Sequence, residues 1–416
     1  MTTTGGTFAR LLDPAVRADP YPVFEQIRQS GAVRIGEAPV VVLAGYAECA
    51  ALLRDPGAGV ERRHATIPMG NTPTHDLAGP HAIELRDTTS FLFRDPPDHT
   101  RLRRLVSKAF TPSVIRRLEP RITAIVDQAL DRAAAQGSLD LVADLAYPLP
   151  VTVICELLGI PLSDEPRLRN WSSLLARSLD PVSSSAPEFR PDAEELVRAN
   201  NELYDYFDEL ARTRRAAPGD DLLSGLITAE DSGDLLTHNE LIATCGLLLM
   251  AGHETTVNLI ANGGLALLRH PEHLETLRTE ADFGAQVIEE TLRYDPPVQL
   301  IPRIVYQDIR IGELELRQGD VAVMLLAAAH RDPSVFPQPA RFDPYRENKH
   351  LAFGLGPHFC LGASLARLEA DIALTRFAQR VIEPRLTCDP PAYRAHVNLR
   401  GPAAMPLTYT KILPAE

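Results

Sequence analysis

The ten residues from Phe353 to Gly362 constrain this chain more than any other stretch. Two glycines precede Cys360 and one follows it, so the backbone can come close to a large planar group at this point. A helix is predicted from Gly362 to about Arg380, and its N-terminal dipole and free N–H groups would stabilise a thiolate over a thiol. The pattern therefore predicts a loop that presents Cys360 as a thiolate, the form in which cysteine is an electron-donating ligand to iron.

A second informative segment lies inside a long helical pattern. Thr237 and Glu240 form a capping box at its start. Further along, residues 252–256 interrupt an apolar helix with polar groups, which is costly unless these residues serve a function. A zinc site of the His-Glu-x-x-His type is excluded, because Val257 stands where the second histidine would be.

Two charged pairs share helix faces. Glu290 and Arg293 are three residues apart, and His99 and Arg103 are four apart, so the members of each pair can act together. Either pattern alone is common on protein surfaces. Their positions relative to the cysteine make them informative, because Glu290 precedes Cys360 by about seventy residues.

In this order, the motifs resemble those of the cytochrome P-450 family. The family's haem-binding pattern, Phe-Gly-x-Gly-x-His-x-Cys-x-Gly, is matched at Phe353, Gly354, Gly356, His358, Cys360 and Gly362. Its oxygen-activating motif, Ala-Gly-x-Asp/Glu-Thr-Thr, is matched at Ala251, Gly252, Glu254, Thr255 and Thr256. The resemblance runs from about Asp19 to the end of the chain. It is closest to soluble bacterial members that tailor secondary metabolites.

The resemblance implies a bound haem b (iron protoporphyrin IX) with Cys360 as the axial ligand. Thr255 is expected to hold dioxygen and an ordered water, and Glu254 to relay protons from solvent. The alternative is that Thr255 and Thr256 only bond back to carbonyls of the preceding turn. Further contacts with the haem are expected from Phe353, Gly354, Ala251 and Gly252.

Four basic residues match family positions that grip the haem propionates. They are His99, Arg103, Arg303 and His358. Two anionic carboxylates in a partly dry site need cationic or hydrogen-bonding partners. For each residue alone, an ordinary surface charge is the competing interpretation.

The resemblance also assigns Glu290 and Arg293 to a structural latch. The family completes this latch with a second arginine from a Pro-x-Arg-Phe segment, and Arg341 stands in the matching position. We therefore expect Arg341 to hold Glu290 together with Arg293. One departure is His330, where the family more often carries asparagine, and we expect it to be harmless.

The predicted fold is mainly α with a small β portion, and the resemblance places the haem between a long central helix and the cysteine loop. Apolar periodicity predicts helix for most of residues 97–270, and alternation predicts short strands within 304–324. Residues 55–94 and 180–192 are predicted to be loops. No linker, low-complexity run or internal repeat divides the chain, so residues 1–416 are expected to form a single domain.

Composition argues against several classes of function. The net charge of −13 argues against nucleic acid or an anionic membrane as the partner. The polar N-terminus lacks the apolar core of a secretory signal, and no run of about 18 apolar residues predicts a membrane span. The five cysteines contain no CxxC pair, which argues against a disulfide framework or a zinc knuckle and favours a cytoplasmic protein.

The implied reaction is insertion of one oxygen atom of O2 into a C–H or C=C bond of a lipophilic small molecule, in secondary metabolism. Electrons are expected from NAD(P)H through a ferredoxin reductase and a ferredoxin, and the chain is expected to be a monomer. Val298 and Leu300, with the 60–93 and 170–195 regions, are candidate substrate contacts. The same site could instead serve oxidative coupling or desaturation, or the protein could be a non-catalytic thiolate-haem sensor.

A charge contrast indicates where a ferredoxin would dock. Residues 94–117 hold seven basic residues against two acidic ones, in a chain whose net charge is −13. Helical spacing places Arg101, Arg104 and Lys108 on one outward face, whereas the resemblance assigns Arg103 inward. An acidic ferredoxin would be steered to such a face, and the alternative is an ordinary solvated basic helix.

Overall fold

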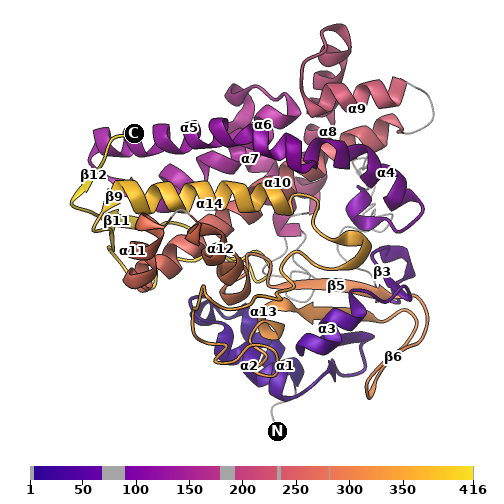
Figure 1. Cartoon of the computed structure of the whole chain (residues 1–416). Helices are drawn as coiled ribbons and strands as arrows, with labels where there is room; N and C mark the ends of the chain where they lie inside the picture. The colour runs from indigo at the N-terminus through magenta and orange to yellow at the C-terminus, as the bar shows by residue number, and fades with distance from the viewer. Residues whose placement is uncertain (1–3, 68–89, 179–192, 232–235, 281, 416) are drawn as a thin grey trace.

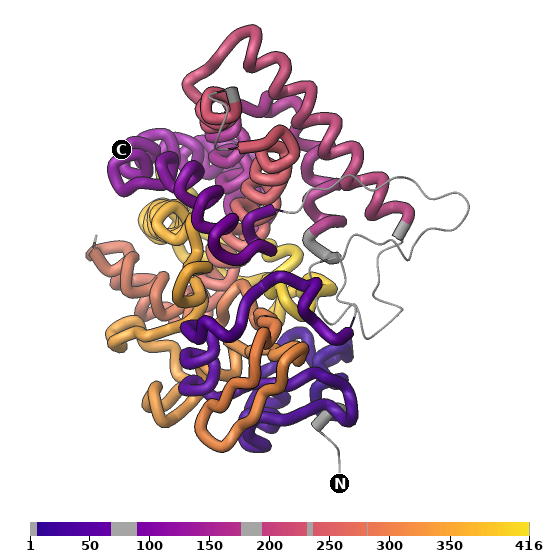
Figure 2. Tube along the Cα trace, turned by 90° about the vertical axis from the view of Figure 1, so that its right-hand side faces the viewer, coloured from indigo at the N-terminus to yellow at the C-terminus, as the bar shows by residue number. Residues whose placement is uncertain are grey.

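The computed structural model describes residues 4–67, 90–178, 193–231, 236–280 and 282–415. Helices fill most of it, and Figure 1 shows the long helices stacked in one half of the molecule while the main sheet lies in the other, near the N-terminus. Short strands near the C-terminus lie beside the helical half. Figure 2, seen from the side, shows the same division, with helices of residues 193–231 at the end opposite the N-terminus. The prediction of a mainly helical protein with a small β portion is confirmed.

The α-helices follow one another along the whole chain. They are α1 (Thr4–Ala9), α2 (Tyr21–Gln29), α3 (Tyr46–Leu52), α4 (Asp98–Val106), α5 (Pro112–Gln136), α6 (Pro148–Leu158), α7 (Glu165–Ser178), α8 (Ala193–Ala216), α9 (Leu222–Asp231), α10 (His238–Arg269), α11 (Pro271–Thr279), α12 (Phe283–Tyr294), α13 (Leu326–Ala329) and α14 (Ala363–Arg380).

The strands are short, and the described residues form one main sheet with three small ones. They are β1 (Val33–Arg34), β2 (Val40–Leu43), β3 (Ala58–Gly59), β4 (Leu139–Asp140), β5 (Leu300–Val305), β6 (Ile309–Ile311), β7 (Leu314–Leu316), β8 (Val321–Leu325), β9 (Val381–Ile382), β10 (Arg385–Leu386), β11 (Pro406–Thr408) and β12 (Lys411–Ile412). The main sheet has the order β1-β2-β8-β5-β3, in which only β2 and β8 pair in parallel. Both are apolar runs, as strands covered on both faces require.

The central helix α10 begins and packs as its sequence dictates. The capping box is confirmed, because the side chain of Thr237 accepts from the Glu240 N–H while the Glu240 side chain accepts from the Thr237 N–H. Two glycines then bring neighbours close: a Cβ on Gly263 would lie 2.7 Å from Leu374 of α14, and one on Gly264 would lie 2.9 Å from Leu141. These glycines therefore set the spacing of α10 against α14 and the segment before α6.

The C-terminal helix α14 confirms the prediction of a helix from about Gly362 to Arg380. The strands expected within residues 304–324 are also present, although β5 begins earlier, at Leu300. The loop predicted at 180–192 lies outside the described residues. One stretch, Leu141–Leu158, is long and apolar enough to cross a membrane, but 61% of it is buried inside the protein, as is typical of a core helix.

Candidate active site

The cysteine loop has the conformation that its glycines permit. Gly354 and Gly356 have φ angles of +69° and +72°, in the left-handed region that favours glycine. A Cβ on Gly356 would lie 2.9 Å from the carbonyl oxygen of Leu53, so this position also requires a close approach. The loop closes where the N–H of Cys360 donates to the carbonyl of Phe353 at 2.8 Å, three residues before α14 begins.

Opposing influences act on the Cys360 thiol. The residue is solvent-accessible at its surface, yet the protein around the sulfur raises its pKa through desolvation. The N–H groups of Gly362 and Ala363 and the charges of Arg103 and Arg367 act in the opposite direction. These N–H donors and cations favour the thiolate form of Cys360, the form that binds a metal ion.

One face of α10 is open where most of the helix is buried. Ala251 is exposed and Thr255, one turn later, is partly exposed, while the helix residues on either side of them are largely buried. Gly252 backs onto Ile154, where a Cβ would meet a side-chain carbon at 3.2 Å. The hydroxyl of Thr255 donates to the carbonyl of Ala251 at 2.8 Å. The back-bonded conformation that was considered as the alternative is therefore the one observed for Thr255.

Glu254, beside Thr255, is a buried carboxylate with a distant cation. It is 5% exposed, and its Oε2 has no hydrogen-bond partner. Nη1 of Arg394 lies 3.6 Å from that oxygen. Burial raises the pKa of Glu254, and the charge of Arg394 partly opposes the rise. A carboxyl in this environment can take up and release protons more readily than an ordinary surface glutamate.

His99 and His358 come together at the other side of the site. Their ring centroids are 4.1 Å apart. His99 is 2% exposed, neither ring nitrogen has a partner, and burial lowers its pKa to about 4. His358 instead contacts Asp95, with 3.4 Å between Nε2 and Oδ1. Burial would raise the pKa of Asp95, but hydrogen bonds from His358, Tyr306 and the Val60 N–H hold it well below its usual range.

Arg103 and Arg303 complete this basic cluster. Arg103, on α4, donates to the carbonyl of Phe359 and lies close enough to His99 to affect its pKa. Arg303, on β5, has its pKa lowered by burial, while the nearby Asp95 acts in the opposite direction. The four residues matched to propionate positions thus converge from α4, β5 and the cysteine loop. The partly buried Arg103 and Arg303 and the unpartnered His99 ring fit a prosthetic group that carries two carboxylates.

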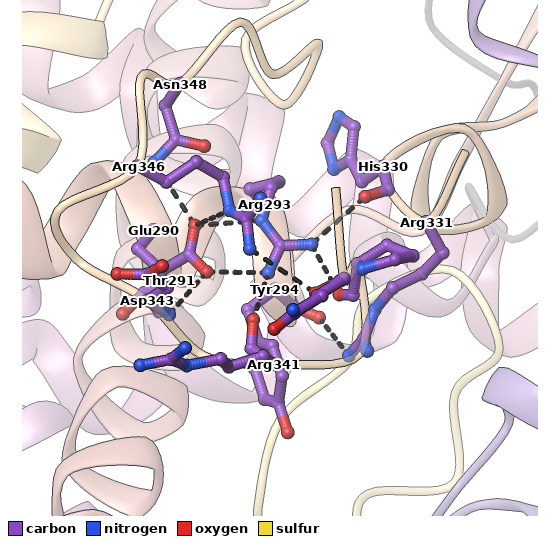
Figure 3. Close-up of polar contacts among 12 residues, drawn as sticks. Glu290, Thr291, Arg293, Tyr294, His330, Arg331, Arg341, Asp343, Arg346 and Asn348 are labelled. Carbon is purple, nitrogen blue, oxygen red and sulfur yellow. Dashed lines mark hydrogen bonds and ion pairs between the residues drawn. The ribbon is translucent and has the colours of Figure 1, made fainter. Parts of the chain in front are cut away.

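The latch is centred on a fully buried ion pair between Glu290 and Arg293, both on α12 (Figure 3). Two parallel hydrogen bonds of 2.6 and 2.8 Å join the carboxylate to the guanidinium. Arg293 also donates to the carbonyls of His330, Pro339 and Arg341. Every charge is therefore compensated by hydrogen bonds, as a buried ion pair requires.

The expectation that Arg341 holds Glu290 is wrong. Figure 3 shows that Arg341 joins the network through its backbone carbonyl, and its side chain is exposed. The second arginine is Arg346, whose Nε lies 3.6 Å from Glu290 Oε2. Glu290 also accepts from the N–H of Asp343 and from the side chain of Asn348. The loop turns after the Pro-x-Arg-Phe segment, and this turn brings Arg346 rather than Arg341 over the carboxylate.

His330 ties the latch to the segment before the cysteine loop. Its Nε2 accepts from the N–H of Leu351 at 2.7 Å, while its carbonyl accepts from Arg293. Burial holds the pKa of His330 well below its usual value, so the ring is neutral and can accept this bond. The side chain thus supplies the acceptor that an asparagine carbonyl oxygen could also provide.

One of the two candidate substrate contacts needs correction. Leu300 is fully buried in a core cluster with Phe24 and Val323, because its position on β5 points it toward α2 and away from the active site. It is therefore not a substrate contact, whereas Val298 is half-buried and remains a candidate. Most of the 60–93 region and residues 179–192 lie outside the described residues.

Arg101 does not belong to an outward basic face. It forms an ion pair with Glu240 at the start of α10, with an N–O distance of 2.5 Å. The positive charge of Arg101 is therefore neutralised by Glu240 within the protein. Arg104 and Lys108 are exposed, as expected for a docking surface.

Sequence reasoning missed three residues of the site: Asp95, Arg346 and Arg394. Asp95 and Arg346 sit within a few residues of recognised motifs, and a search for charged neighbours of those motifs could have found them. No sequence signal connects Arg394 to Glu254, because the two residues are far apart along the chain.

Residues 32–382 match the family model described as Cytochrome P-450. The chain is 38% identical over 405 residues to the cytochrome P-450 monooxygenase PikC of Streptomyces venezuelae, covering 95% of this chain and 92% of that protein. It is 37% identical to the vitamin D(3) 25-hydroxylase of Pseudonocardia autotrophica, covering 98% of each. Among solved structures, Mycobacterium smegmatis CYP164A2 with econazole bound is 49% identical and superposes with a TM-score of 0.90 over 97% of this chain and all of that one.

Proposed function

Because this chain belongs to the cytochrome P-450 family of monooxygenases, we propose that it hydroxylates or epoxidises a lipophilic small molecule with one oxygen atom of O2. The observation that carries the proposal is the pair formed by Glu254 and Thr255. A buried carboxyl with a raised pKa stands next to a hydroxyl on the open face of α10. This pair supports proton delivery to a reacting group, which a non-catalytic sensor would not require.

The residues of the cysteine loop and the basic cluster would hold the prosthetic group, which we propose to be haem b. A bound haem supplies the binding and reductive activation of dioxygen. Cys360 would donate its thiolate to the iron, and the positive φ angles of Gly354 and Gly356 give the loop the conformation that presents it. The four basic residues would grip the propionates: His99, Arg103, Arg303 and His358.

Thr255 and Glu254 would deliver the protons. In the structure the Thr255 hydroxyl donates to Ala251, so it must turn away from that carbonyl to donate into the active site. A threonine hydroxyl can make this change by a rotation about one bond. Glu254 would replace the proton that Thr255 gives up, since the burial that raises its pKa also favours its protonated form.

We assign electron delivery to a ferredoxin, supplied from NAD(P)H by a ferredoxin reductase. The exposed Arg104 and Lys108 on and just after α4 support this choice, because Arg103 on the same helix lies close to Cys360. An acidic ferredoxin attracted to these charges would dock near the proposed iron ligand. Electrostatic attraction of this kind raises the association rate and weakens with salt.

The proposed substrate is lipophilic and belongs to secondary metabolism. One relative is named for its action on vitamin D(3), an apolar molecule, which supports this class of substrate. Val298, between α12 and β5, would contact it. We further propose that residues 1–416 act as a single domain, as a monomer, in the cytoplasm.

An isotope experiment tests the proposal. Lipophilic compounds that shift the Soret band of the holoenzyme are turned over with a ferredoxin, its reductase and NADPH under oxygen-18 gas. The expected product carries one oxygen-18 atom, and reactions without NADPH yield none. A product that lacks the label, whether coupled or desaturated, would overturn the assignment of oxygen insertion.

A further inference from the structure

Arg367, on α14, places a positive charge beside the cysteine loop. Its Cζ lies 4.5 Å from the centre of the Phe353 ring, and the carbonyl of Phe353 accepts from the Cys360 N–H. Burial raises the pKa of the Cys360 thiol, and the charge of Arg367 is one of the influences that lower it. The guanidinium is therefore close enough to the sulfur to act on its charge.

Glu289, on α12, fixes the position of this guanidinium. Its carboxylate accepts two hydrogen bonds from Arg367, from Nε at 2.5 Å and from Nη2 at 3.0 Å, and such paired bonds set the orientation of both groups. The ring of His350 lies on the same carboxylate, with 3.1 Å between Nε2 and Oε2. Burial would raise the pKa of Glu289, but the bonds from His350 and Arg367 lower it to about 2, so the carboxylate is charged at neutral pH.

The Arg367–Glu289 pair is separate from the latch. Glu290, the next residue of α12, binds Arg293, whereas Glu289 reaches α14. The Arg367 and Glu289 side chains are 36% and 34% exposed, so water screens part of their charge. The Phe353 ring covers the guanidinium on the side of the cysteine loop, where the charge is screened less. An ordinary salt bridge that only joins α12 to α14 is the competing interpretation.

We propose that Arg367 raises the reduction potential of the haem iron bound by Cys360, and that Glu289 limits this effect. Reduction adds one electron from the ferredoxin, and no bond forms or breaks. A cation near the thiolate stabilises the added negative charge, while an anion opposes it. Charges and hydrogen bonds around a metal-bound sulfur set the potential in this way. The inference rests on the proposed ligation of the iron by Cys360.

A redox titration of the holoenzyme, followed by its absorption spectrum, tests the proposal without turnover. Arg367→Gln removes the cation and should lower the equilibrium constant for one-electron reduction at least about threefold, a shift of about 28 mV, because tenfold corresponds to 59 mV. Glu289→Gln removes the opposing anion and should raise the constant at least about twofold. Arg367→Lys keeps the charge and should stay within about 1.5-fold of wild type. A salt bridge with only a structural role would not shift the constant in opposite directions.

Arg376→Gln is the matched control, because Arg376 lies farther along α14 and pairs with Asp127 at 2.6 Å. It should keep the wild-type constant. The reduced carbon monoxide complex of each protein reports whether Cys360 still binds the iron. An unchanged constant in either Arg367→Gln or Glu289→Gln, with the red-shifted band intact, would overturn the inference and keep the ligand. A wild type without that band would remove the ligand and the inference together. If Arg367→Gln does not retain haem, Glu289→Gln decides alone.

Discussion

Oε2 of Glu254 lies 3.6 Å from Nη1 of Arg394, which joins the central helix to a turn near the C-terminus. Desolvation raises the pKa of the carboxyl, and the cation reduces that rise. Arg394 therefore keeps a buried acid able to release its proton.

This relationship predicts a pH-dependent stability. Because the pKa of Glu254 is higher in the folded protein than the unfolded value near 4.5, its favourable contribution is complete below that pH and is lost as pH rises through the folded pKa. The melting temperature of wild type should therefore fall relative to that of Glu254→Gln as pH increases above about 4.5. A constant difference between pH 4 and pH 8 would contradict the raised pKa.

Cys360→Ser should remove the thiolate signature. If Cys360 is the axial ligand, the reduced carbon monoxide complex of wild type shows the family's red-shifted Soret band, and the serine variant does not. Cys388→Ser, at the other exposed cysteine, is the control and should keep the band. A red-shifted band in Cys360→Ser would end the assignment.

Thr255→Ala should separate electron consumption from product formation. The variant loses the hydroxyl that delivers protons, so NADPH electrons should be diverted to peroxide while substrate binding is kept. Removal of one positioned proton-transfer group costs on the order of 10²–10⁴ in rate. Product and peroxide per NADPH give the measurement, and Thr244→Val should remain coupled. Unchanged coupling of NADPH to product in Thr255→Ala would show that the Thr255 hydroxyl does not deliver protons.

Because only Arg346 places its side chain near Glu290, we expect Arg346 and Arg341 to differ in their contribution to the free energy of unfolding. Arg346→Ala removes a cation beside the buried Glu290 carboxylate and should lower the free energy of unfolding by about 1–3 kcal/mol. Arg341→Ala keeps the backbone carbonyl that Arg293 uses and should change it by less than about 0.5 kcal/mol. Urea unfolding of the two variants measures both values. Equal losses would show that the Arg341 side chain takes part.

Glu290→Ala should be far more severe than either change. It leaves the fully buried Arg293 without its anionic partner, and breaking a buried pair costs roughly 3–5 kcal/mol. That is a large part of a typical stability margin. We expect poor folding or loss of haem, and normal haem content with an unchanged melting temperature would argue against it.

Charge reversal at the proposed docking surface should slow reduction. Arg104→Glu combined with Lys108→Glu should lower the second-order rate of reduction by a ferredoxin and flatten its salt dependence, with substrate affinity intact. Arg132→Glu changes an exposed arginine near the end of α5 and is the control, which should keep the wild-type rate. Stopped-flow rates at low salt decide the matter, and a rate equal to that of wild type would move the docking site elsewhere.

Local patterns in the sequence were sufficient to predict the elements that depend on neighbours along the chain. The capping box at Thr237, the helix after Cys360 and the Glu290–Arg293 pair all involve residues within four positions of each other. The choice of Arg346 over Arg341 depends instead on how a loop turns. Periodicity alone could not show that Leu300 faces α2, because the strand lies between two layers.

The glycine pair in α10 limits how this protein can diverge. Thr255 and Cys360 are carried by α10 and by the loop that leads into α14, and Gly263 and Gly264 set how closely α10 approaches its neighbours. A methyl group at Gly263 would meet the buried Leu374 side chain at 2.7 Å, and one at Gly264 would meet the buried Leu141 side chain at 2.9 Å, so these leucines would have to repack in an interior that tolerates added volume poorly. Residues that face the substrate can therefore drift to suit new molecules, while two positions that touch no substrate hold the separation of the reacting groups constant.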